Sequence, residues 1–228
     1  MTTIARVSRN CAVCGTLSSQ VVLGSTNTFG PSDLDTRPAE MLRSTLPYWI
    51  ERCPACGFCA PDISKPQEGA AGIVRTPAYQ EQFRDHGVPA LANSFLCHAL
   101  LLEHAARYSD GGWAAVHAAW ACDDEGSPAE SRCRERAVLL FRMAREQGQA
   151  VASQPGADEA VLSDLLRRSG HNGEAMAACR DGLAMDPEPL IAAVLRFQQA
   201  LIGREDRKAH TIADAMEAAG KAGFEFPQ

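Results

Sequence analysis

Four cysteines near the start of the chain form two pairs with the same spacing. Cys11 and Cys14 lie in the sequence CAVCG, and Cys53 and Cys56 lie in CPACG. A two-residue spacer lets both thiolates of a pair reach one metal ion from a tight turn, which the following glycine permits. Two such knuckles, brought together by strands, make a tetrahedral four-sulfur site with no open position for water or substrate. The pattern therefore predicts a structural zinc ion held by these four cysteines.

A third cysteine after the second pair leaves an alternative open. Cys59 extends the run to CPACGFC, which overlaps the start of a bacterial ferredoxin motif. That motif needs a fourth cysteine where Ile63 stands, followed by a proline, and Pro61 comes too early. We therefore predict that Cys59 is a small buried residue beside the zinc site. An iron–sulfur redox protein is the alternative, in which Cys59 takes part in metal binding.

Composition and charge limit the class of protein. The chain has 228 residues, nine cysteines and a net charge of −6, which argues against a general nucleic-acid scaffold. The first ten residues, MTTIARVSRN, lack the apolar core of a signal peptide. No apolar run approaches the roughly 20 residues of a membrane helix. We expect a cytoplasmic protein, in which clustered cysteines bind metal more often than they form disulfides.

The chain changes character near residue 66. Residues 1–65 are rich in Thr, Ser, Pro and Cys, and strand-like runs occur at 20–23 and 48–52. Residues 64–72, SKPQEGAAG, are typical of a linker. The sequence therefore predicts an α+β protein with two domains. A small zinc-ribbon-like β module over residues 1–66 precedes an all-α, tetratricopeptide-like domain over residues 74–228.

Helix signals recur after the linker. Thr76 followed by Pro77 predicts a capped helix start, and an apolar repeat predicts a helix over 89–107. The sequence SDGG at 109–112 is expected to end that helix, and a helix containing Trp113 follows. Ser127 to Glu130 form a capping box that opens another helix. Further helices are expected at about 157–169, 173–185, 188–203 and 208–220.

One helical hairpin is more specific. Leu162 and Leu166 share one helix face, and the facing helix offers small residues at Ala175, Cys179 and Gly182. A proline, Pro187, follows its end. Small residues allow two helices to pack closely, and this arrangement resembles a tetratricopeptide repeat. The sequence shows no second repeat of equal quality, so this unit must pack on the helices around it.

A family resemblance covers most of the chain and is sharpest over residues 10–60. The knuckle CAVCG, the stretch STNTFGPSDLDTRPAEMLRSTLPYWIERCPACGF and the helical tail resemble a bacterial family catalogued as a domain of unknown function. In that family, a zinc-ribbon-like module precedes a tetratricopeptide-like region. The resemblance implies that Cys11, Cys14, Cys53 and Cys56 are the metal ligands. It brings no established activity.

The remaining candidates favour structural roles. Asp33 and Asp35 are expected to cap turns or pair with arginines such as Arg37. Cys97 and His98 are neighbours in an apolar helix and point in different directions, which favours core packing over a catalytic dyad. No phosphate loop, nucleophile elbow or HExxH motif is present. Whether the chain is an enzyme stays open, with a binding role favoured.

The function that these observations favour is an adaptor. We expect a protein partner, bound through the helical domain, because repeat-like helical arrays commonly act as binding platforms. A nucleic-acid-binding ribbon is the alternative, weakened because residues 1–65 carry only six basic side chains against five acidic ones. The sequence leaves open whether the helical groove is free or is filled by the C-terminus near Phe224 and Phe226.

Overall fold

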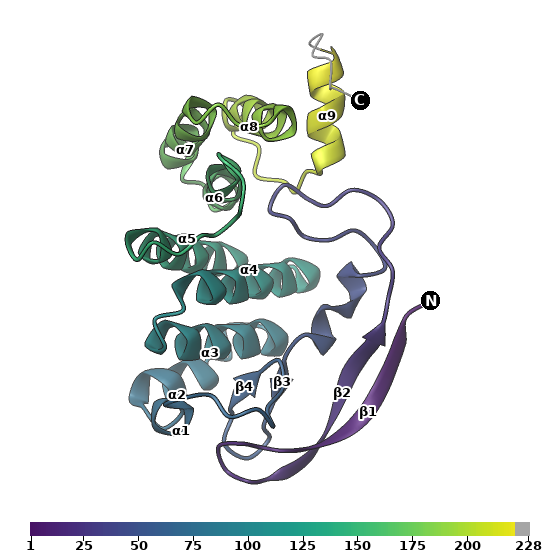
Figure 1. Ribbon diagram of the computed structural model, residues 1–228, viewed down its shortest axis with the longest axis vertical. Helices are drawn as coiled ribbons and strands as arrows, with labels where there is room; N and C mark the ends of the chain where they lie inside the picture. Colours follow the sequence, from purple (N-terminus) through teal and green to yellow (C-terminus); the bar gives the residue numbers. More distant parts are fainter. Residues whose placement is uncertain (222–228) are drawn as a thin grey trace. The chain divides into compact units, whose positions relative to one another are not determined.

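The computed structural model describes residues 1–221 (Figure 1). Phe224 and Phe226 lie outside the described residues. The chain divides into two compact units: unit 1 comprises Met1–Thr28 and Glu40–Ala144, and unit 2 comprises Phe29–Ala39 and Arg145–Gln228. This grouping differs from a division at the expected linker. The two domains expected at residues 1–66 and 74–228 stay a prediction. Within the described residues, no helix has the length and apolar character needed to cross a membrane.

Two antiparallel hairpins form the β part of unit 1. Strands β1 (Thr3–Asn10) and β2 (Leu17–Ser25) pair along their length, and the shorter β3 (Glu51–Arg52) and β4 (Cys59–Ala60) form the second hairpin. Each hairpin therefore ends in a loop that carries one cysteine pair. The α+β prediction is confirmed. The expected strand run at 20–23 lies in β2, whereas most of the run at 48–52 is not a strand, because a 3-10 helix, η1 (Arg43–Tyr48), precedes β3.

Five helices begin in unit 1. They are α1 (Ala70–Ile73), α2 (Pro77–Phe83), α3 (Ala90–His104), α4 (Tyr108–Glu125) and α5 (Glu130–Glu146), whose last residues belong to unit 2. The hydroxyl of Thr76 accepts a hydrogen bond from the amide of Tyr79 at 3.3 Å, which confirms the predicted cap of α2. Helices α3 and α4 pack against each other as a hairpin.

The expected helix break at 109–112 is wrong. Helix α4 begins at Tyr108 and includes both Gly111 and Gly112. A Cβ atom at Gly112 would overlap the ring of Phe141 in α5. Gly112 therefore allows α4 and α5 to approach closely, and this packing outweighs the low helix propensity of glycine.

Unit 2 contains four more helices of the described chain. They are α6 (Ala157–Arg168), α7 (Asn172–Ala184), α8 (Pro189–Ile202) and α9 (Ile212–Lys221). All four lie within three or four residues of their predicted bounds. Gly182 of α7 packs between the neighbouring helices: a Cβ there would come 2.7 Å from Cβ of Glu159 in α6 and 2.9 Å from Cδ1 of Leu195 in α8. The expected close packing of this hairpin is confirmed.

Residues 29–39, although early in the chain, belong to unit 2. The amide of Leu34 donates to the carbonyl of His210, and the amide of Ile212 donates to the carbonyl of Ser32, both at 2.9 Å. A short antiparallel bridge thus joins this segment to the residues just before α9. The sequence analysis did not anticipate this pairing.

Buried charge holds the same segment against α6. The carboxylate of Asp35 is fully buried and lies 3.1 Å from a guanidinium nitrogen of Arg168. It also accepts the backbone amide of Arg37 at 3.2 Å. Because a buried carboxylate is stable only when it is paired, this contact supports the structural role expected for Asp35.

The close packing at Gly182 gives a test of unit 2. We expect Gly182→Ala to destabilise the protein by about 1–3 kcal/mol, because the added methyl group overlaps two neighbouring helices. Gly173, on the same helix, has open space around its Cβ position, so Gly173→Ala is the matched control. Denaturant unfolding should show the control unchanged or slightly more stable. Equal effects of the two substitutions would contradict the packing described above.

Candidate metal centre

The four sulfur atoms of the two cysteine pairs lie within 4.8 Å of one another. Sγ of Cys11 is 3.7 Å from Sγ of Cys56, and Sγ of Cys14 is 3.6 Å from Sγ of Cys53. A tetrahedral ion with metal–sulfur bonds of about 2.3 Å separates its sulfur ligands by about 3.8 Å. The cluster therefore has the dimensions required by a single four-coordinate metal ion.

Both knuckles use the same backbone turn. In each, the first cysteine accepts a hydrogen bond from the glycine amide and donates its own amide to the carbonyl five residues further on. These bonds, 2.8–3.0 Å long, join Gly15 to Cys11, Cys11 to Thr16, Gly57 to Cys53 and Cys53 to Phe58. Both glycines adopt positive φ, +74° and +76°. The turn needs this conformation, which explains the glycine that follows each pair.

The four thiols differ in their surroundings. Cys11 and Cys53 are buried, whereas Cys14 is exposed. Burial raises the pKa of Cys11 and of Cys56. The side-chain hydroxyl and the amide of Thr16 lower the pKa of Cys14 to about 6. Because a metal binds the thiolate form, Cys14 is ready for coordination at neutral pH, whereas Cys11 and Cys56 lose their protons when the ion binds.

The second knuckle is anchored to helix α2. The hydroxyl of Tyr79 donates to the carbonyl of Gly57 at 2.9 Å, and the ring of Phe83 lies against the same glycine. The guanidinium carbon of Arg52 lies 4.2 Å from the centre of the Phe83 ring, a cation–π contact. The sequence analysis did not identify either aromatic residue, since they lie beyond the linker and no local pattern connects them with the knuckle.

A buried glutamate joins the two hairpins. Glu51 is only 3% exposed, and its carboxylate accepts Nε of Arg9 at 3.1 Å and the amide of Ile63 at 2.9 Å. The carbonyl of Ile63 in turn accepts the amide of Ala12 in the first knuckle at 2.8 Å. The sequence analysis missed Glu51. Its one sign was an acidic residue directly after the apolar run at 48–50 and two positions before Cys53.

The other cysteines stand apart from the cluster. Cys59 is fully buried in β4, and its thiol donates to the carbonyl of Gly57 at 3.2 Å. Its neighbour Cys97 and its burial both raise the pKa of Cys59 well above the usual range. Cys97, Cys133 and Cys179 are buried, as expected for core residues. Within residues 1–221, the four knuckle cysteines form the one group of metal-binding side chains gathered in this way.

Comparison with known proteins finds no match among protein-family models, curated proteins or solved structures. The family resemblance described above therefore rests on the quoted sequence motifs alone. The chain has a four-cysteine cluster able to hold a metal ion, and the rest of its described residues are mostly helical.

The two knuckle glycines differ in one respect that can be tested. Either alanine substitution strains a left-handed turn, at a cost of about 1–2 kcal/mol. Only at Gly57 would the new Cβ also overlap Phe83, because nothing lies within 4 Å of the Cβ position at Gly15. We therefore expect Gly57→Ala to lower the melting temperature and the resistance of bound metal to a chelator more than Gly15→Ala does. A larger effect at Gly15 would contradict this anchoring of the second knuckle.

Proposed function

We propose that Cys11, Cys14, Cys53 and Cys56 bind one structural zinc ion. Sulfur separations of 3.6 and 3.7 Å, close to those around a tetrahedral zinc ion, carry this proposal. Four thiolates complete the coordination of zinc and leave no position for a reacting molecule. The ion's role is to hold two hairpins together, and its binding energy, on the order of 10 kcal/mol in zinc-finger peptides, becomes folding energy.

The geometry also favours a single ion over an iron–sulfur cluster. A cluster places several irons and bridging sulfides between its thiolates, so the cysteine sulfurs must lie farther apart than in a one-ion site. The thiol that would support the cluster alternative, Cys59, donates its hydrogen bond to Gly57 and lies outside the group of four.

Metal analysis of protein purified without oxygen tests this proposal. We expect one zinc per chain and no visible absorbance in the wild-type protein and in Cys59→Ala. Cys53→Ala is the matched comparison, since both cysteines are fully buried, and it should lose the zinc and unfold at a lower temperature. Iron in a coloured protein, or loss of metal in Cys59→Ala, would refute the assignment.

We further propose that the helical part binds a protein partner through a groove between α8 and α9. This groove, within unit 2, has a volume of about 810 Å³. Its apolar surface comes from small and aromatic side chains, including Phe197, Ala200 and Ala218. Small residues leave room for the side chains of a bound segment, as in helix-in-groove recognition.

The charges around the groove indicate the chemistry of the partner. Glu217 pairs with Lys221 at 2.6 Å, and Asp214 accepts hydrogen bonds from the amide and hydroxyl of Thr211. The acidic side chains of α9 thus have partners of their own. Arg204 also borders the groove, and within residues 1–221 its guanidinium has no ion-pair partner. A segment with apolar residues and at least one carboxylate complements this surface.

Selection from a random peptide library tests the groove. We expect peptides that combine apolar and acidic residues to be enriched, and Ala218→Glu to weaken their binding by about tenfold or more through like-charge repulsion. The control is Ala213→Glu, which adds the same charge to an exposed position of α9 outside the groove. No enriched sequence, or equal weakening by both substitutions, would count against the adaptor proposal.

The structure gives less support to nucleic-acid binding by the ribbon. Arg9 is engaged by Glu51 and Asp62, at 3.1 and 3.4 Å, and Arg52 lies over Phe83. Phosphate contacts require basic side chains that are available to the nucleic acid. We therefore keep protein binding as the proposed function.

A further inference from the structure

A cavity of about 290 Å³ lies in unit 1. It is bounded by the loops around η1 and β4 and by the α3–α4 hairpin. Aromatic side chains, Trp49, Phe95, Trp113 and His117, form part of its wall beside aliphatic residues such as Ile50 and Leu102. Ligand pockets usually start at about 300 Å³, so this cavity matches a molecule of one or two fused rings. Neither the zinc site nor the α8–α9 groove includes any of these residues.

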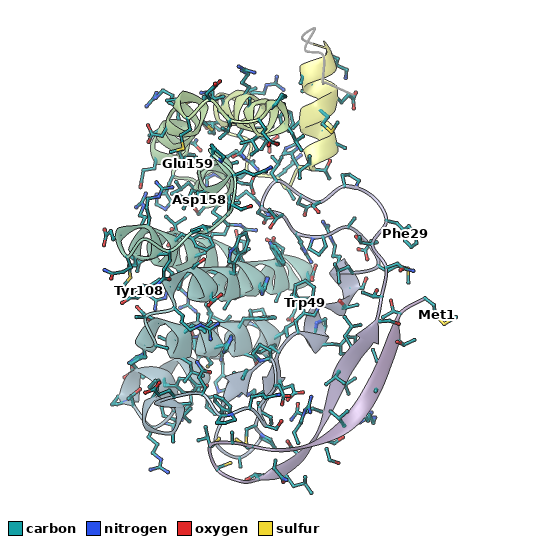
Figure 2. The ribbon with its side chains drawn as sticks, viewed as in Figure 1. Met1, Phe29, Trp49, Tyr108, Asp158 and Glu159 are labelled. Carbon is teal, nitrogen blue, oxygen red and sulfur yellow. The ribbon has the colours of Figure 1, made fainter. Side chains whose placement is uncertain are left out.

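The aromatic wall is held in a defined geometry. Trp49, labelled in Figure 2, lies with its ring centre 5.2 Å from that of His117, and Phe95 lies 5.3 Å from the same imidazole, both edge to face. The indole nitrogen of Trp49 donates to the hydroxyl of Thr45 at 2.8 Å. The polar atom of Trp49 is therefore already satisfied, and its ring contributes an ordered apolar surface.

One acceptor stands out on this wall. Nδ1 of His98 lies 3.1 Å from the carbonyl oxygen of Cys59. Since a carbonyl only accepts, Nδ1 carries the hydrogen and Nε2 carries the lone pair. Burial lowers the pKa of His98 to about 4, so the ring is neutral at pH 7. Within residues 1–221, Nε2 makes no hydrogen bond, and His98 lines the cavity.

The rim carries opposite charges that compensate each other. Arg107 and Asp110 form an ion pair at 2.8 Å, and their side chains are 58% and 54% exposed. Both border the cavity. This ion pair therefore adds no net charge that would attract an ionic ligand, while the wall offers aromatic surface and the Nε2 acceptor of His98.

We propose that this cavity binds a small, uncharged, planar aromatic molecule whose N–H or O–H group donates a hydrogen bond to Nε2 of His98. The aromatic walls contact the ring faces and edges of such a molecule. The donor requirement follows from the lone pair on Nε2, which an apolar ligand would leave unsatisfied after displacing water. This inference is independent of the zinc ion and of the adaptor role.

Calorimetric titration with indole and 1-methylindole tests the donor requirement. The two ligands share the bicyclic ring, but 1-methylindole lacks the N–H group. We expect indole to bind with a dissociation constant below about 1 mM, a range available to so small a ligand. Because a neutral hydrogen bond contributes modestly, we expect 1-methylindole to bind about fivefold more weakly. Absence of saturable indole binding, or equal affinity for the two compounds, would overturn the proposal.

Protein variants locate the site. His98→Phe keeps an aromatic ring but removes the acceptor, so indole should lose its advantage over 1-methylindole. His104→Phe, at an exposed position of the same helix, is the control. In this variant indole should still bind more tightly than 1-methylindole. Ala114→Leu leaves His98 in place and fills part of the cavity, and should weaken both ligands. Unchanged binding in a folded His98→Phe or Ala114→Leu protein, checked by circular dichroism and metal content, would place the ligand elsewhere and refute the assignment.

Discussion

The convergence of four thiols within 4.8 Å is the constraint on which the β part of this protein depends. The second hairpin has only two paired residues on each strand, too little hydrogen bonding to persist alone. The first hairpin is longer, but most of its side chains are exposed, so it buries little apolar surface. The second hairpin is buried against the helices, but the first has no core of its own that would place its cysteine pair opposite the other.

The two knuckles share a backbone turn but are supported differently. The second knuckle packs against helix α2, where Tyr79 and Phe83 contact its Gly57. The first is the loop of an exposed hairpin and meets the rest of unit 1 through the carbonyl of Ile63. Glu51 connects these two supports, because its carboxylate binds β1 through Arg9 and the segment after the second knuckle through Ile63. A single buried side chain thus links both halves of the cluster.

Local patterns in the sequence predicted a large part of this arrangement. Cysteine spacing and the glycine after each pair identified the clustered thiols, and apolar periodicity with caps located the helices of unit 2. Strand β1 was missed because most of its side chains are exposed, so it lacks the alternation of a half-buried strand. Gly111 and Gly112 were misinterpreted because their packing partner lies on another helix. The support from Glu51 and Tyr79 depends on contacts between distant parts of the chain, which spacing does not reveal.

The pairing of residues 29–39 with the residues before α9 has a consequence for how the chain is made. A ribosome releases the 29–39 segment early, but its hydrogen-bonding partners, His210 and Ile212, are synthesised long after it. The carboxylate of Asp35 must likewise remain hydrated until Arg168 of α6 has been synthesised. Unit 2 therefore cannot complete its fold until Ile212 has been synthesised. The first half of the chain can assemble its thiol cluster and the α3–α4 hairpin while this segment still waits for Arg168, His210 and Ile212.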